Sequence, residues 1–313
     1  MKIKNESARM GMRVQETSRP PARRTLMTDR IKIGKSAGFC FGVKNAVDAA
    51  YSNANNDKPI YTYGKIIHND YVVDDLKRRN VLPISDPAEL PENATVIIRA
   101  HGIAPNELAL LRHRGAKIID ATCPYVAKIH EIVSEDYKLG RQIIIAGDEN
   151  HPEVKGINGY CDNTAWIVNA VNPQSAELTA PLPKEPNNPI TIVSQTTMRQ
   201  DIYKQIVKFF KKRFTDVKIY DTICSATINR QTEGAEIARN SDVCIVIGGA
   251  SSSNTNKLFE VCKQHCEHTF QIENAAELDK IKKFINKNTI VGITAGASTP
   301  AEIIEEVVSR WKR

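Results

Sequence analysis

The feature that most constrains the fold of this chain is a unit that its sequence repeats three times. Each copy begins with a Lys-Ile segment typical of a short strand, continues through a cysteine and leads into a helix-like stretch. The cysteines are Cys40 in GFCFGV, Cys123 in DATCPYV and Cys224 in TICSATI. In every copy a second apolar segment ends in a glycine 24 residues after the cysteine, at Gly64, Gly147 and Gly248. This shared register predicts three similar α/β units of about 90 to 100 residues.

The alternation of strands and helices predicts small parallel sheets with right-handed crossovers. Residues 31–122, 123–222 and 223–313 are expected to form the three α/β units, after a basic extension at residues 1–30. Ligands of such sheets bind at the carboxyl ends of the strands, where the repeated cysteines lie. A pseudo-threefold trefoil would bring the loops of all units to one central cluster site, whereas a linear array would keep three separate sites. The loops differ between units in a complementary way, which favours one shared site.

The net charge of +7 is concentrated in residues 1–30, which hold eight Lys/Arg against three Asp/Glu. The rest of the chain carries only +2, so neither a nucleic-acid surface nor a nucleic-acid partner is expected. No apolar run approaches the roughly 18 residues that cross a bilayer, so no membrane association is expected. The extension is interpreted as disordered, or as preceding a start at Met27. We expect a cytoplasmic protein, with organelle targeting by the extension as the less favoured alternative.

The cysteines at the repeated position are predicted metal ligands. A strand-to-helix junction offers backbone N–H groups and the positive end of a helix dipole, and both favour a thiolate. Three thiolates could hold zinc with an open fourth position, or an iron-sulfur cluster in which one iron has no protein ligand. Such an iron is a Lewis acid, and the cluster can deliver electrons, but three cysteines alone leave zinc and iron open. The cysteines without counterparts in other units are assigned to packing: Cys161, Cys244, Cys262 and Cys266.

Polar side chains follow the strands at equivalent positions of the units. His68, His151 and Ser252 each lie four residues past the repeated glycine, and further polar loops follow the third strand of each unit. Hydroxyl and imidazole groups at helix starts are suited to phosphate or diphosphate. The predicted anion site consists of His68, His101, His151, Ser252, Ser253, Asn254 and Ser298.

Glu153 in NHPEVKGI is a carboxylate that follows a loop histidine by two residues. Beside a metal-bound hydroxyl it would act as a proton donor. Thr196 in SQTTM is its predicted hydrogen-bond partner, although the sequence does not rank Thr196 above the adjacent Thr197.

Taken together, these motifs resemble those of the 4-hydroxy-3-methylbut-2-enyl diphosphate reductase family, also called IspH or LytB. The similar segments run from about residue 31 to the C-terminus: GFCFGV, HNDYVVDDL, RAHGI, DATCPYV, NHPEVKGI, SQTTM, TICSATINRQ, SSNTNKL and TAGAS. The family pattern does not extend to residues 1–30, which leaves their role open.

The resemblance implies a trefoil around one 4Fe-4S cluster with three cysteine ligands and one open iron. By motif, Cys40, Cys123 and Cys224 look like the cluster ligands, and Glu153, Thr196 and His151 look like the catalytic residues. The implied substrate-binding set is His68, His101, His151, Thr196, Ser252, Ser253, Asn254 and Ser298. The implied reaction is reductive removal of the allylic hydroxyl of a small-molecule diphosphate, giving isopentenyl and dimethylallyl diphosphates as the last step of the non-mevalonate isoprenoid pathway. A ferredoxin or flavodoxin is the implied electron donor.

Two other functions remain as alternatives. A non-redox dehydratase would use the open iron only as a Lewis acid, and an external reductant requirement would distinguish it. An iron-sulfur sensor would need a DNA-binding or partner-binding element, and the sequence shows neither a basic recognition helix nor an exposed apolar one.

Overall fold

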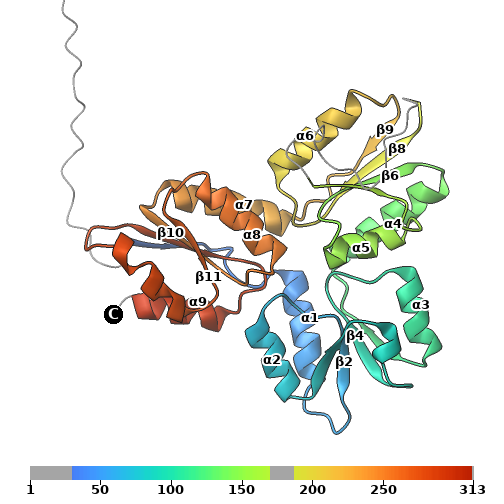
Figure 1. Ribbon diagram of the computed structural model, residues 1–313, viewed down its shortest axis with the longest axis horizontal. Helices are drawn as coiled ribbons and strands as arrows, with labels where there is room; N and C mark the ends of the chain where they lie inside the picture. The colour runs from blue at the N-terminus through green and yellow to red at the C-terminus, as the bar shows by residue number, and fades with distance from the viewer. Residues whose placement is uncertain (1–29, 170–186, 312–313) are drawn as a thin grey trace, which may run out of the picture.

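Three four-stranded parallel sheets form the framework of the molecule, a computed structural model in which residues 30–169 and 187–311 are described. The strands are β1 (Ile31–Ile33), β2 (Ile60–Tyr63), β3 (Val81–Ile84), β4 (Thr95–Ile98), β5 (Lys117–Asp120), β6 (Gln142–Ala146), β7 (Trp166–Val168), β8 (Ile190–Ser194), β9 (Val217–Ile219), β10 (Val243–Ile247), β11 (Thr269–Ile272) and β12 (Val291–Ala295). The sheets have the orders β3-β2-β4-β5, β7-β6-β8-β9 and β11-β10-β12-β1, with every pair parallel. Figure 1 shows them as three lobes around a common centre, which confirms the predicted trefoil of α/β units. Apart from Arg30, the expected extension at residues 1–30 lies outside the described residues.

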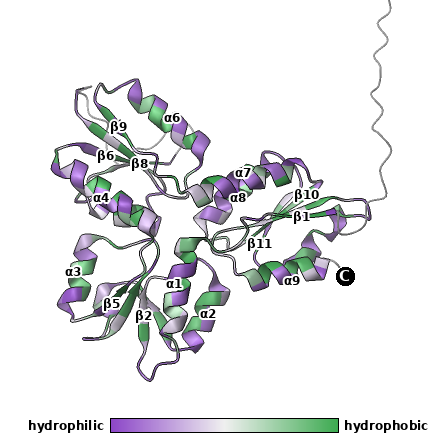
Figure 2. Ribbon diagram, turned by 180° about the vertical axis from the view of Figure 1, so that it is seen from behind, coloured by the Kyte–Doolittle hydropathy of each residue, from purple (hydrophilic) through white to green (hydrophobic). Residues whose placement is uncertain are grey.

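Helices cover both faces of each sheet. They are α1 (Phe41–Ser52), α2 (Asp70–Arg78), α3 (Pro105–His113), α4 (Pro124–Lys138), α5 (Pro152–Gly159), α6 (Gln200–Lys211), α7 (Ser225–Arg239), α8 (Ser253–Lys263) and α9 (Ala301–Trp311), with short 3-10 turns η2 (Pro87–Glu89), η3 (Ala275–Lys280) and η4 (Lys282–Phe284). Because a parallel sheet is covered on both sides, its central strands are continuously apolar, as in β10 (VCIVI), where every residue is buried. Figure 2 shows hydrophobic strands inside each lobe and polar residues on the outer helix faces. Among the described helices, none combines the length and apolarity that crossing a membrane requires.

The strand before each repeated cysteine completes the sheet of the preceding unit. Strand β5 precedes Cys123 and closes the first sheet, and β9 precedes Cys224 and closes the second. Residues 31–33 were expected in the first unit, 31–122, but β1 pairs with β12 at the edge of the third sheet, with Ile31 opposite Val291. In Figure 1 it is the blue strand inside the orange and red lobe. The reason is the repeat itself, since the first copy has no preceding unit and its strand joins the last one.

The carboxyl ends of the strands face the centre of the trefoil, where several helices begin. Proline occupies the first turn of α3, α4 and α5, where a missing N–H costs no helical hydrogen bond. Polar residues cap the starts of α2, α5 and α8, namely Asn69, His151 and Ser252. Helix N-termini from all three lobes therefore surround one central space.

Candidate active site

A pocket of about 770 Å³ lies at the centre, where the three lobes meet. All twelve residues predicted from the sequence line it: Cys40, His68, His101, Cys123, His151, Glu153, Thr196, Cys224, Ser252, Ser253, Asn254 and Ser298. They come from loops and helix starts of every unit. The arrangement is therefore one shared pocket rather than three separate ones.

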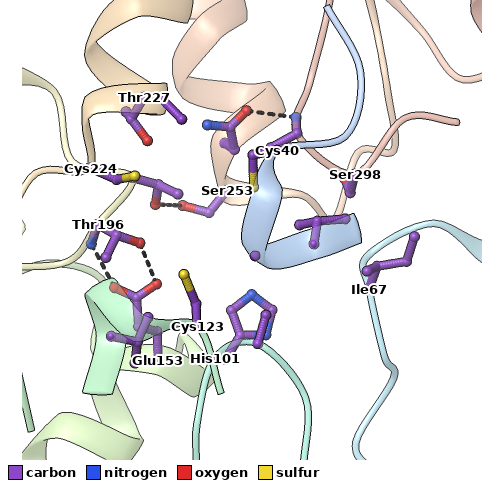
Figure 3. Close-up of a pocket in the computed structure, with 18 of the residues that line it drawn as sticks. Cys40, Ile67, His101, Cys123, Glu153, Thr196, Cys224, Thr227, Ser253 and Ser298 are labelled. Carbon is purple, nitrogen blue, oxygen red and sulfur yellow. Dashed lines mark hydrogen bonds between the residues drawn. The ribbon is translucent and has the colours of Figure 1, made fainter. Parts of the chain in front are cut away.

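The three repeated cysteines occupy the same structural position. Cys40, Cys123 and Cys224 are the N-cap residues of α1, α4 and α7, each with extended backbone angles and a free thiol. Figure 3 shows their sulfur atoms directed into the same space, with Glu153 and His101 on either side of Cys123. Burial raises the pKa of the Cys123 thiol, and the backbone N–H groups of Tyr125 and Val126 offset this only in part. At Cys123, burial therefore outweighs the effect of the two backbone N–H groups at the helix start.

Gly42 lets α1 approach the second cysteine closely. A Cβ atom at Gly42 would lie 2.6 Å from the Sγ atom of Cys123 and 2.9 Å from its Cβ atom. No side chain larger than hydrogen fits between the start of α1 and this thiol. The GFCFG motif thus positions two thiols at once, Cys40 through its own place in the chain and Cys123 through the missing side chain.

The spacing of the thiols bears on what they could hold. Within the described residues, His68, His101 and His151 are the residues whose metal-ligating atoms all lie within 4.8 Å of one another, and the three cysteines do not form such a set. One zinc ion bound by three sulfurs at about 2.3 Å would require sulfur-sulfur distances of about 3.8 Å. At least one pair of the cysteine sulfur atoms is therefore more than 4.8 Å apart, wider than in a site for a single ion, which fits a larger, multinuclear group.

Glu153 and Thr196 form a buried pair at the edge of this space. The Oε1 atom of Glu153 accepts a hydrogen bond from the backbone N–H of Thr196 at 2.6 Å, and Oε2 accepts from the Thr196 hydroxyl at 2.7 Å. Thr197 instead places its hydroxyl 3.3 Å from that of Ser253, so the structure separates the two threonines that the sequence could not rank. Burial raises the pKa of Glu153, whose side chain is almost inaccessible, against the opposing effect of the Thr196 donors and the charge of Lys257. A raised pKa favours the protonated form of the carboxyl group over the ionised form.

The three histidines face one another, with ring centroids 5.1 to 5.8 Å apart. Burial is the main reason that their pKa values are lowered, to about 3 for His151. The Nδ1 atom of His151 accepts from the N–H of Glu153 at 3.2 Å, so the proton of the neutral ring is on Nε2. Among the described residues, no partner binds the buried Nε2 atom of His68 or the buried Nδ1 atom of His101. Neutral imidazoles with unused hydrogen-bonding atoms are suited to receive a polar ligand.

The serine and asparagine residues are held by bonds among themselves and to the backbone. The Oγ atom of Ser252 caps α8 by accepting from the N–H of Thr255 at 3.3 Å, and it also accepts from the Ser298 hydroxyl at 3.2 Å. The Oδ1 atom of Asn254 accepts from the N–H of Ala297 at 2.9 Å. This network fixes the orientation of the side chains that the third lobe contributes to the pocket wall.

Sequence reasoning missed several residues of the pocket wall. Thr227 and Arg230 lie on α7 one and two turns after Cys224, and both line the pocket. The signal was available in TICSATINRQ, because positions three or four apart on a helix share a face. The buried Arg230 donates to the carbonyl oxygens of Ser36 and Gly38 at 2.6 to 3.0 Å, and so ties α7 to the loop before Cys40.

The buried neutral histidines predict that stability falls as the pH is lowered. The unfolded chain takes up protons on His151 below about pH 6.5, whereas the folded chain does so only near its pKa of about 3. The free energy of unfolding therefore decreases between these limits, by up to about 1.4 kcal/mol per pH unit for each such histidine. Differential scanning calorimetry from pH 7.5 to 5 should show a falling midpoint, with a shallower fall in His151→Gln. The exposed His113→Gln variant is the control, and equal slopes in both variants would contradict the prediction.

Comparisons with known proteins identify related chains over most of this length. The model of the family described as LytB protein matches residues 31–312. A 4-hydroxy-3-methylbut-2-enyl diphosphate reductase of Thermoanaerobacter sp. (strain X514) is 42% identical over 290 residues, covering 90% of this chain and 96% of the relative. The reductase of the same name from Clostridium acetobutylicum is 44% identical over 285 residues, which are 90% of this chain but only 43% of that relative. This chain thus spans less than half of the Clostridium protein.

Two solved structures resemble this one across the same region. The E-1-hydroxy-2-methyl-but-2-enyl-4-diphosphate reductase of Plasmodium falciparum aligns with a TM-score of 0.82 at 30% identity, covering 90% of this chain and 88% of that chain. A structure of (E)-4-hydroxy-3-methylbut-2-enyl diphosphate reductase, the terminal enzyme of the non-mevalonate pathway, aligns with a TM-score of 0.64 at 40% identity, covering 90% and 98%.

Proposed function

Because this chain belongs to the LytB protein family, we propose that it reduces (E)-4-hydroxy-3-methylbut-2-enyl diphosphate to isopentenyl and dimethylallyl diphosphates. In this reaction, two electrons and two protons replace the allylic C–O bond with a C–H bond and release water. The observation that carries the proposal is the meeting of three N-cap cysteines, one from each repeat, beside the buried Glu153–Thr196 pair in a single pocket.

The donor set suits one 4Fe-4S cluster held by Cys40, Cys123 and Cys224. Two observations support this proposal: the three residues offer soft thiol ligands, and at least one pair of their sulfur atoms is farther apart than two ligands of a single ion. When bound, such a cluster would supply electrons and an iron without a protein ligand for the substrate oxygen. Arg230 fixes the loop before Cys40 and contributes a buried positive charge on the cysteine side of the pocket.

The histidine and serine side of the pocket would bind the diphosphate. The neutral rings of His68, His101 and His151 offer N–H donors, and Ser252, Ser253, Asn254 and Ser298 offer further hydrogen bonds at the start of α8 and before α9. Anchoring the diphosphate here would direct the allylic end of a short substrate toward the cysteines.

Glu153 would supply the proton that lets the hydroxyl leave as water. Its raised pKa keeps a proton available, and the two hydrogen bonds from Thr196 fix the orientation of the carboxyl group. The remaining allyl anion can be protonated at either end, which gives two products from one intermediate. The bound diphosphate is the proposed source of this second proton, and a ferredoxin or flavodoxin is the proposed source of electrons.

A Mössbauer spectrum of anaerobically prepared, iron-57-labelled protein tests this function, recorded with and without 4-hydroxy-3-methylbut-2-enyl diphosphate. We expect one distinct iron site whose signal changes when the diphosphate is added. Zinc in place of iron would overturn the reductase. A cluster indifferent to the diphosphate would instead support a sensor, and turnover without a reductant would support a dehydratase.

A further inference from the structure

The wall of the proposed diphosphate site is electrically neutral. Its side chains are uncharged hydroxyl and amide groups and three histidines whose pKa values are lowered, chiefly by burial. Arg230 is the cation that lines the pocket, and its guanidinium is directed to the carbonyls of Ser36 and Gly38, on the side of Cys40. A diphosphate carries about three negative charges, so neutral hydrogen bonds leave most of its charge without a counterpart.

Arg99 supplies one positive charge just behind this wall. It follows β4, two residues before His101, and its guanidinium packs on Gly64, where a Cβ atom would lie 2.5 Å from Cζ. Its buried Nε atom has no hydrogen-bond partner, and Arg99 forms no ion pair with any described residue. The carboxylate that acts on it is that of Glu107, which already accepts from the Tyr63 hydroxyl at 2.6 Å.

Lys257 supplies a second charge from the third lobe. It lies on α8 one turn after Ser253, and its ammonium group donates to the Oε1 atom of Gln195 at 3.3 Å. The amide nitrogen of the same Gln195 donates to the Ser253 hydroxyl at 3.4 Å, so a hydrogen-bonded chain joins Lys257 to the pocket wall. Within the described part of the chain, no carboxylate forms an ion pair with Lys257, although three lie close enough to raise its pKa: Glu153, Asp148 and Glu260.

Buried charges without an ion-pair partner are costly, and both cations act on histidines of the wall that would face the diphosphate. We propose that Arg99 and Lys257 are positioning residues for a polyanionic ligand. Their positive charges attract the ligand electrostatically, while the neutral side chains of the wall make the direct contacts with it. Arg99 acts from the first lobe behind His68 and His101, and Lys257 acts from the third lobe through Gln195 and Ser253. The electrostatic effect of Arg99 and Lys257 on His151 places both charges near the same ring. The inference rests on the proposed function, because it assigns the source of charge at that site.

The test compares two inorganic anions of different charge, using cluster-loaded protein and isothermal titration calorimetry. In Arg99→Gln and Lys257→Gln, we expect the Kd of pyrophosphate to rise about tenfold and that of orthophosphate only about threefold, because Coulomb energy scales with ligand charge. Arg99→Lys and Lys257→Arg should restore most of the affinity. Lys155→Gln is the matched control, since Lys155 is also four residues past a pocket residue, His151, but is exposed.

The outcomes separate this inference from the function on which it rests. Equal weakening of both anions, or failure of both charge-conserving variants to restore affinity, would identify a structural role and overturn the inference. Glutamine variants that behave like Lys155→Gln would also overturn it. If the unmodified protein bound neither pyrophosphate nor the substrate, the proposed diphosphate site itself would fail, and the inference with it. An unchanged visible spectrum of the cluster shows that a variant keeps its fold.

Discussion

We expect turnover of the Glu153→Gln variant to fall by about 10²- to 10⁴-fold, the range for loss of a positioned proton donor. Glutamine has nearly the same shape, and it can keep both bonds by accepting from the Thr196 N–H and donating to the Thr196 hydroxyl. The amide cannot release a proton to the leaving hydroxyl. The effect should therefore appear in kcat, measured anaerobically with a chemical reductant, while the Kd of pyrophosphate and the iron content stay unchanged.

Two further variants serve as comparisons for Glu153→Gln. Glu149→Gln removes an exposed carboxylate from the same loop and should leave kcat intact. Thr196→Val removes the hydroxyl that orients Glu153 but leaves its proton in place, so a smaller loss is expected. Full activity in Glu153→Gln would exclude it as the proton donor, and loss of the cluster in that variant would assign it a structural role instead.

In the Gly42→Ala variant, we expect the affinity for the proposed cluster to fall about tenfold or more. The added Cβ atom would lie 2.6 Å from the Cys123 sulfur, and relieving that contact moves either α1 or the thiol out of position. Overpacking of this kind costs about 1 to 3 kcal/mol. The measurement is iron and sulfide per chain after anaerobic reconstitution, followed by the rate of cluster loss to a chelator.

Gly156→Ala is the matched control, because it adds the same methyl group to helix α5. The nearest atoms to a Cβ at Gly156 are the backbone oxygen of His101 and the Nε2 atom of His130, both at 3.7 Å, which are ordinary contacts. Alanine in a helix is more stable than glycine by about 0.5 to 1 kcal/mol, so this control should keep its iron and gain stability. Equal cluster loss in both variants would show that the close approach at Gly42 is unimportant.

The repeat made much of the pocket predictable. Equal offsets along three copies identified Cys40, Cys123, Cys224 and the polar positions after each glycine, because equivalent positions in a symmetric fold converge on its axis. Thr196 and Thr197 could not be ranked, since adjacent residues differ only in the direction of their side chains. Arg99 and Lys257 were not predicted because they lie behind the wall and have no common register among the units. Their environment depends on packing between distant segments, which spacing along the chain does not encode.

The pairing of β1 with β12 has a consequence for how the protein is made. Ile31 pairs with Val291, so a strand that leaves the ribosome early waits for a partner translated 260 residues later. The first two sheets draw all their strands from continuous stretches of chain and can be completed during synthesis, whereas the third cannot. Closing so long a loop carries a large entropic cost and slows folding. The loop that carries Cys40 directly follows β1, so we infer that Cys40 reaches its place beside Cys123 and Cys224 only after β12 has been synthesised.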